Sequence, residues 1–150
     1  GPTMVPSRER VVMSLESLDQ RPGLIVHELT HAFALEIVPA TSRRMPVLIE
    51  GLAQHQRGAW DAQELTVIRA DVAVQAIPSV ADLDDTDRHW AHAMFDFVAE
   101  QNGEEGVRRL LFALRVHSTL APAVPMAFGE TLAQFDDACR RYLTNRFSQP

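Results

Sequence analysis

Two histidines and a glutamate stand within one apolar stretch, residues 24–33, at the spacing of a catalytic zinc motif. In an α-helix, His27 and His31 lie one turn apart on the same face, so both imidazoles can bind one metal ion about 2.0–2.1 Å away. Glu28 directly follows the first histidine and can act as a general base on a metal-bound water. The motif therefore predicts a helix that carries two zinc ligands and a base.

A third zinc ligand is needed, because catalytic sites commonly use three protein ligands and a water. Glu50 lies 19 positions after His31, in a second apolar segment in which Pro46 suits the first turn of a helix. A buried, unpaired carboxylate is costly, and a metal ion would supply its partner. Residues 39–44 form the expected loop between the two helices. We therefore expect zinc to be bound by His27, His31 and Glu50.

The two segments, His27–His31 and Pro46–Ala53, resemble the metal-binding segments of the gluzincin metallopeptidases. Within that group they are similar to the bacterial peptidase MA-like domains, which carry HELTH followed by P-x-W-L-x-E-G-x-A. The order of the later segments is also similar, so the resemblance covers roughly residues 11–147. The metzincin alternative is disfavoured, because no glycine and third histidine follow shortly after His31.

The resemblance implies a role for each site residue. Zinc would be bound by His27, His31 and Glu50, Glu28 would be the base, and the substrate would be a peptide or protein. Gluzincins usually place a tyrosine or histidine beyond the third ligand, where it stabilises the oxyanion. The only tyrosine of this sequence, Tyr142, lies near its end.

Two further histidines are the candidates for that missing oxyanion donor. His89 and His92 share one face of a predicted helix, and Asp96 follows His92 by one turn. The helix comes after the loop over residues 77–83, which in the family's order leads back across the site. We therefore expect His92, or failing it His89, to direct its ring toward the metal. Surface histidines are the alternative for both, and His55 is a third candidate.

The expected fold class is α+β, zincin-like and mostly helical with a small N-terminal sheet. The β-branched run over residues 8–15 predicts a strand. Helical spacing of apolar residues predicts further helices over 61–76, 86–102, 104–116 and 132–146, and the prolines at 122 and 125 predict a loop. With 150 residues and 46% hydrophobic content, the chain is expected to form one domain, residues 1–150.

Composition excludes some partners and leaves the compartment open. A net charge of −6 with dispersed arginines disfavours nucleic-acid binding, and no stretch is long and apolar enough to predict a membrane segment. Cys139 is expected to be buried on the last helix. Gly1-Pro2 matches the scar of a cleaved purification tag, in which case the chain is an excised domain. We expect a soluble domain, cytoplasmic or exported with a targeting segment that this chain lacks.

The main hypothesis is thus a zinc-dependent metallopeptidase, with two alternatives from other classes. The first is a zinc-bound but non-proteolytic zincin-like binding domain, motivated by the missing tyrosine and the small sheet. The second is an all-helical interaction module in which the motif arose by chance, and zinc content would separate it from the others. Gln54, one turn after Glu50, could accept a hydrogen bond from a histidine ligand, and a solvated glutamine is an equal alternative.

Overall fold

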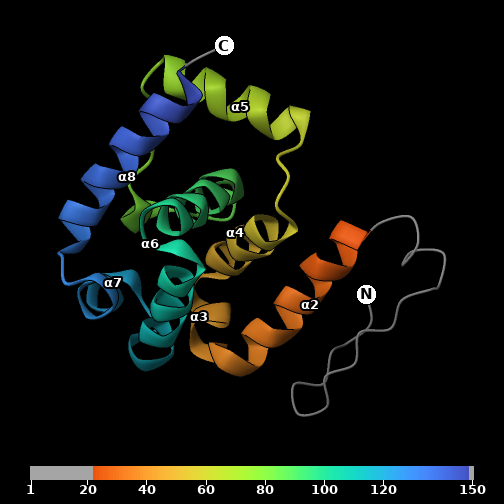
Figure 1. Ribbon diagram of the computed structural model, residues 1–150, viewed down its shortest axis with the longest axis vertical. Helices are drawn as coiled ribbons and strands as arrows, with labels where there is room; N and C mark the ends of the chain where they lie inside the picture. Colours follow the sequence, from red (N-terminus) through yellow and green to blue (C-terminus); the bar gives the residue numbers. More distant parts are fainter. Residues whose placement is uncertain (1–21, 149–150) are drawn as a thin grey trace.

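Helices make up 81% of the part of the chain that the computed structural model describes, residues 22–148 (Figure 1). They are α2 (Pro22–Ile37), α3 (Pro39–Arg44), α4 (Pro46–Arg57), α5 (Ala62–Ala73), α6 (Arg88–His117), α7 (Leu120–Phe128) and α8 (Leu132–Phe147), with a 3₁₀ turn, η1 (Val80–Asp82). These seven α-helices are accompanied by no strand within residues 22–148, so the α+β prediction is wrong. The strand expected over residues 8–15 lies outside the described residues.

The expected loop over residues 39–44 is also wrong, because these residues form α3. Pro39 occupies the first turn, where a missing N–H costs no hydrogen bond. Thr41 is fully buried, and its Oγ1 donates to the carbonyls of Leu114 at 3.3 Å and Ser118 at 3.2 Å. These contacts join the connection between α2 and α4 to the end of α6.

Residues 120–128 form α7 rather than the loop that their prolines predicted. Pro122 lies in the first turn, where its missing N–H has no helical partner to lose. Pro125 lies inside the helix and does cost a hydrogen bond. One helix face nevertheless buries four apolar side chains at helical spacing, and this burial outweighs the loss: Leu120, Ala123, Val124 and Ala127.

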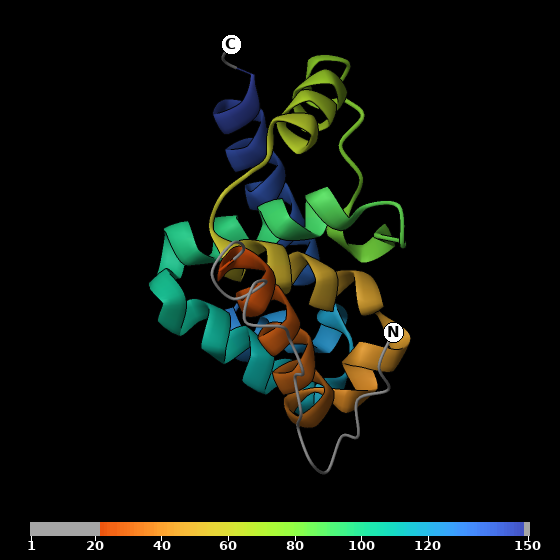
Figure 2. The same ribbon diagram turned by 90° about the vertical axis from the view of Figure 1, so that its right-hand side faces the viewer.

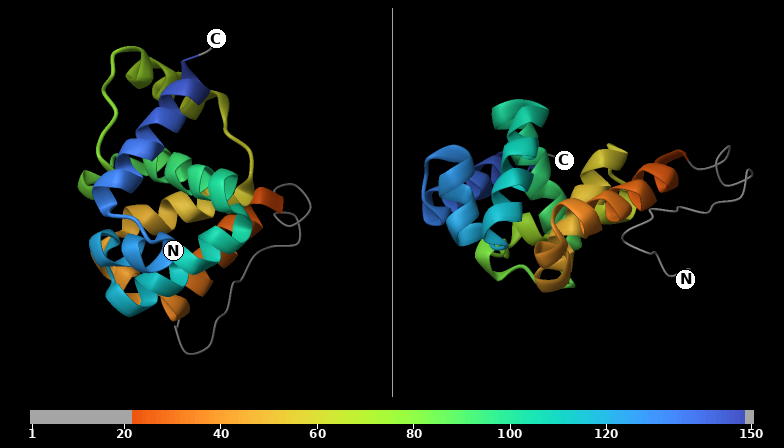
Figure 3. Two further views of the ribbon diagram at one scale, coloured as in Figure 1. Left: turned by 60° about the vertical axis from the view of Figure 1, so that its left-hand side comes forward. Right: turned by 90° about the horizontal axis from the view of Figure 1, so that it is seen from below.

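The helices predicted over residues 86–102 and 104–116 form the two halves of α6. Gly103 separates them, with φ 69° and ψ −178°, a conformation that glycine adopts readily. Figure 3 shows the second half of α6 turning away from the first. Ser118 then ends the helix in the left-handed region, at φ 68°.

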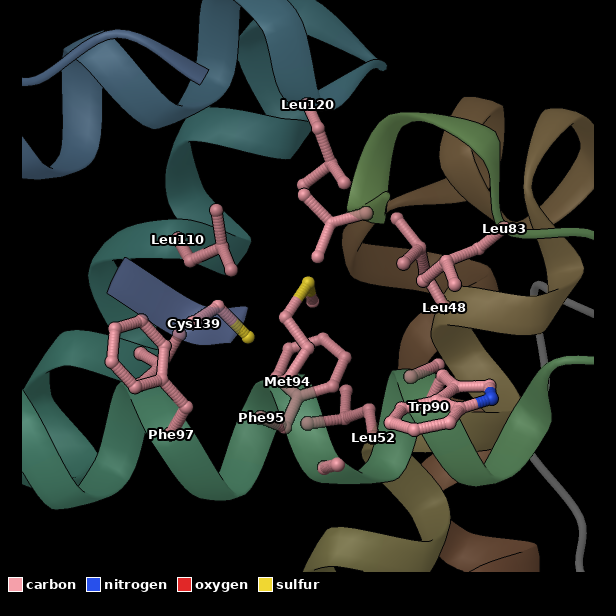
Figure 4. Packing of buried hydrophobic residues seen from close by; sticks show 14 of the residues in the cluster. Leu48, Leu52, Leu83, Trp90, Met94, Phe95, Phe97, Leu110, Leu120 and Cys139 are labelled. Carbon is pink, nitrogen blue, oxygen red and sulfur yellow. The ribbon is translucent and has the colours of Figure 1, made fainter. Parts of the chain in front are cut away.

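The core is built around α4 and the first half of α6, which pack closely together. α2 packs on the other side of α4 and lies along the outside of the molecule (Figure 3). α5 and the end of α8 stand at the opposite end (Figure 2). Figure 4 shows the centre of the core, with α4, both halves of α6, and α8 contributing side chains such as Leu48, Leu52, Met94, Phe95, Leu110 and Cys139.

Among residues 22–148, none of the helices combines the length and the apolar composition that crossing a bilayer requires.

Candidate metal centre

The three predicted metal ligands come together between α2 and α4. His27 Nε2 lies 3.0 Å from Glu50 Oε1, and His31 Nε2 lies 3.0 Å from Glu50 Oε2. The two Nε2 atoms are 3.1 Å apart. One ligand atom from each residue can therefore be chosen so that all lie within 4.8 Å of one another, which is the spacing of a metal site.

The spacing and chemistry of these atoms fit a zinc ion. Ligand atoms about 2.0–2.1 Å from a tetrahedral zinc lie about 3.3 Å from one another, close to the separations seen here. Two imidazole nitrogens and one carboxylate are a ligand set of catalytic zinc sites, whereas structural sites are richer in cysteine. The side chains of His27, His31 and Glu50 are 15%, 30% and 29% exposed, so a water or substrate can approach from the open side.

Glu50 is held in the ionised form that metal binding requires. A hydrogen bond from His31 lowers its pKa most, and although burial acts against this, the charges of His27, His31 and Arg88 lower it further. Carboxylate ligands must be deprotonated, so this environment prepares Glu50 to bind a cation.

Helix geometry accounts for the position of each ligand. His27 and His31 lie one turn apart on α2, and Pro46 begins α4 one turn before Glu50. Gly51 then allows α4 to approach α6 closely, because a Cβ at this position would lie 2.4 Å from the Cβ of Ala91. The sequence reasoning did not single out Gly51 as a positioning residue. A glycine in a helix interior directly after a metal ligand is the signal that could have found it.

Glu28 lies in α2 between the two histidines, as the motif predicted. The placement of its side chain lies outside what the structure describes, and its role as base stays a prediction. Gln54 is 9% exposed, so it is buried rather than solvated. Its Oε1 has no hydrogen-bond partner, so it does not hold a histidine ligand in this conformation.

His92 belongs to a different group of side chains, which we call the His92 network: His55, Trp60, Glu64, His92, Asp96 and Arg146. Its ring is fully buried and stacks on Trp60, with centroids 3.9 Å apart and planes 10° apart. Nδ1 faces Glu64 Oε2 at 3.5 Å, and Nε2 faces Asp96 Oδ1 at 3.6 Å. These partners differ from those of the metal ligands, and the donor role of His92 stays a prediction.

His89 also has its own partners. Its Nε2 lies 3.6 Å from Asp71 Oδ2 of α5, and its ring lies 5.3 Å from that of Trp90. Burial lowers its pKa, although Asp71 acts in the opposite direction. His89 thus contributes to the contact between α5 and α6, and its role as an alternative donor stays a prediction as well.

Within the His92 network, burial favours the neutral imidazole of His92 and the protonated carboxyl group of Glu64. It lowers the pKa of His92 to about 4 and raises the pKa of Glu64 to about 7. At neutral pH His92 is therefore a neutral ring, and Glu64 carries its proton about half of the time. The close approach of these two residues is not an ordinary ion pair.

Asp96 is the centre of the network, which the sequence reasoning placed only beside His92. Its carboxylate accepts hydrogen bonds from His55 Nδ1 at 2.6 Å, Trp60 Nε1 at 2.8 Å and Arg146 Nη1 at 2.9 Å. His55, the third candidate donor, is also bound to Glu104 through Nε2 at 3.0 Å. Burial acts to lower the pKa of His55, but its carboxylate partners outweigh burial and raise it.

Tyr142 lies in α8, and its hydroxyl accepts a hydrogen bond from Arg146 at 3.1 Å.

Comparison of the chain with known protein families, with curated proteins and with solved structures finds no match. The candidate function therefore rests on the geometry of the metal centre.

Proposed function

We propose that this protein is a zinc-dependent metallopeptidase of the gluzincin type. The observation that supports this most strongly is the convergence of His27, His31 and Glu50. Two histidines from a HExxH helix and a glutamate from a second helix form a His₂Glu set, which leaves a coordination position for water. Glu28, which directly follows His27 in the sequence, would supply the carboxylate that this chemistry needs.

In the proposed reaction, each residue has one task. Bound zinc would lower the pKa of a coordinated water toward ~7 and polarise the substrate carbonyl. His27, His31 and Glu50 would hold the ion from the protein side, and their partial exposure would leave the other side to water and substrate. Glu28 accepts the proton of the water as the water attacks the scissile carbonyl, and it then passes that proton to the leaving amine.

A second candidate is a zinc-bound, non-proteolytic binding domain. One observation favours it, namely that each candidate oxyanion donor is engaged elsewhere. His92 is stacked on Trp60, His89 lies beside Asp71, and His55 is bound to Asp96. The only tyrosine of the sequence, Tyr142, is bound to Arg146. A peptidase of this kind needs a donor near the metal, and losing one costs about 10²–10³ in turnover. Such a domain would bind zinc and peptides without cleaving them.

The test is cleavage of casein or a peptide mixture by the zinc-loaded protein, with and without a chelator, compared with Glu28→Gln. The peptidase proposal predicts cleavage that chelation abolishes and that falls by about 10²–10⁴ in Glu28→Gln, because this variant loses the base but no ligand. Zinc content of the variant should equal that of the wild type.

Two results would contradict this proposal. Undiminished turnover in Glu28→Gln would show that another group is the base. Stoichiometric zinc without any cleavage would favour the binding domain, and no zinc at all would favour an interaction module with a chance motif.

A further inference from the structure

The surface helix α7 carries no polar side chain. Its residues, 120–128, read Leu-Ala-Pro-Ala-Val-Pro-Met-Ala-Phe. One side of the helix is buried in the core, whereas Ala121, Pro122, Pro125 and Met126 are exposed. A helix that is apolar on all sides is normally buried on all sides. The outer face of α7 therefore indicates a surface that a partner covers.

The second half of α6 extends this apolar surface. Phe112 and Val116 lie one turn apart on it and are 60% and 53% exposed, and Met126 of α7 is 47% exposed. Phe112, Met126 and Ala127 line a hollow of about 440 Å³ between the two helices. A hollow with an apolar lining can receive an apolar side chain of a bound segment, which is how interfaces are commonly anchored.

Arginines flank the same surface. Arg108 and Arg115 lie about one turn before and one turn after Phe112 on α6. Residues 106–129 contain three arginines and no acidic side chain, although the whole chain has a net charge of −6. Glu105 lies 2.9 Å from Arg108, but both side chains are 69% exposed, so the pair is weak and can exchange partners. The surface is a positive region on an acidic protein, and it complements an acidic partner.

This surface is separate from the candidate metal centre. In Figure 1 the second half of α6 lies between α7 and α2, and the view from below in Figure 3 shows the same order. The metal ligands belong to α2 and α4. A partner bound to α7 would therefore leave the metal centre open.

The shape and charge of the surface favour a protein partner over a membrane or a second copy of the chain. A hollow between two helices accepts a side chain that enters it, whereas bilayer binding depends on protruding side chains, commonly including tryptophan, and residues 106–129 contain none. In a symmetric dimer the arginines of both copies would meet in one interface, and like charges would repel.

We propose that the outer face of α7, together with Phe112 and Val116, binds a protein segment whose apolar face is flanked by acidic side chains, such as an acidic amphipathic helix. An apolar side chain of the segment enters the hollow, and its carboxylates pair with Arg108 and Arg115. This interaction goes beyond the proposed function, and it holds whether or not the metal centre is catalytic.

Selection of short random peptides that bind the full chain tests the surface. The selected peptides should carry apolar residues at helical spacing with aspartate or glutamate beside them. Phe112→Asp and Met126→Asp should each weaken their binding by about tenfold or more, because each places a charge in the apolar contact. Val74→Asp is the matched control, since Val74 is 73% exposed and lies after α5. Peptides that bind all four proteins equally, or that carry mostly basic residues, would overturn the proposal.

Charge reversal tests the role of the arginines. Arg115→Glu should weaken binding of the selected peptides several-fold, and the loss should shrink at high salt. Arg69→Glu makes the same change of net charge on an exposed position of α5 and should have little effect. Equal losses in the two variants would show that the arginines of this surface do not recognise the acidic residues.

Two measurements on the wild type and Phe112→Asp would assign the surface to another occupant and so contradict the proposal. The first is cosedimentation with vesicles that contain phosphatidylserine, if the wild type binds them and Phe112→Asp does not. The second is sedimentation velocity, if the wild type is a dimer that Phe112→Asp dissociates. The proposal predicts a wild type that is monomeric at this surface and does not bind the vesicles. Circular dichroism should show that the variants fold, because the replaced side chains are largely exposed.

Discussion

The metal centre and the His92–Glu64 pair of the His92 network both combine histidine with a carboxyl group, yet they differ in exposure. At the metal centre the side chains are between 15% and 30% exposed. In the network His92 is fully buried and Glu64 is 14% exposed. The carboxyl groups respond in opposite directions, since the pKa of Glu50 is lowered and that of Glu64 is raised to about 7.

The difference shows that residue type alone does not decide what such a cluster does. Where water reaches the carboxylate and two histidines face it, the ionised form is favoured and a cation can bind. Where burial dominates, as at His92 and Glu64, the pKa of the carboxyl rises, the imidazole stays neutral and the pair joins helices instead. The Trp60 and Glu64 contacts with His92 accordingly attach α5 and its leading loop to α6.

Removing the metal should affect only the first region and should have the largest effect on stability. A zinc ion present at about 1,000 times its dissociation constant stabilises the folded state by about 4 kcal/mol. A chelator should therefore lower the melting temperature of the wild type by several degrees. It should leave His31→Ala unchanged, because that variant has already lost a ligand. A melting temperature that does not respond to chelation would show that the ion does not clamp α2 to α4.

Replacing Glu64 by glutamine should expose the pH dependence of His92. The pKa of His92 is about 4 when folded and ordinarily 6.5, so the unfolded state binds more protons between these values and stability is lost as pH falls. Protonation of Glu64 has the opposite effect on stability. Its folded pKa of about 7 lies above the ordinary 4.5, so stability is gained as pH falls through that window.

In the wild type these two effects nearly cancel between pH 4.5 and 6.5. Glu64→Gln removes one of them, so the variant should lose about 2–3 kcal/mol of stability as the pH falls from 6.5 to 4. Urea unfolding at several pH values, with the exposed Glu100→Gln as control, measures the effect. Parallel pH profiles for Glu64→Gln and the wild type would contradict the proton placement in the network.

Gly51→Ala should have a smaller effect and acts where the two regions meet, at the contact of α4 with α6. The added methyl would overlap Ala91, and overpacking of this kind costs about 1–3 kcal/mol. Gln56→Ala, on the exposed face of the same helix, should change stability by less than about 0.5 kcal/mol. Denaturant midpoints compare the two variants. A Gly51→Ala protein as stable as Gln56→Ala would show that the close approach is not required.

The convergence of the three candidate metal ligands could be predicted from the sequence because their arrangement is mostly local. One helical turn fixes His27 relative to His31, and the proline at the start of α4 fixes the turn that carries Glu50. The His92 network could not be predicted, because its contacts join residues far apart in the sequence. His92 contacts Glu64, which is 28 positions away, and Asp96 contacts Arg146, which is 50 positions away. Such contacts depend on how whole helices pack against one another.

The prediction of the fold class was wrong for related reasons. The prolines of α7 predicted a loop, but burial of one apolar face made the segment helical. The expected sheet had its strand in residues 8–15, outside the described part, while residues 22–148 contain only helices as regular elements. The spacing of residues within one helix could be interpreted from the sequence, whereas the contacts between distant helices could not.

The most direct test of the account is the zinc content of two matched variants, Glu50→Gln and Glu64→Gln. Each replaces one carboxyl group by an amide in a cluster that also contains histidine, one at the metal centre and one in the His92 network. Zinc per chain, measured after dialysis, should be close to one in the wild type and in Glu64→Gln and should fall well below one in Glu50→Gln. A wild type without zinc, or a Glu50→Gln variant that retains it while Glu64→Gln loses it, would contradict the assignment.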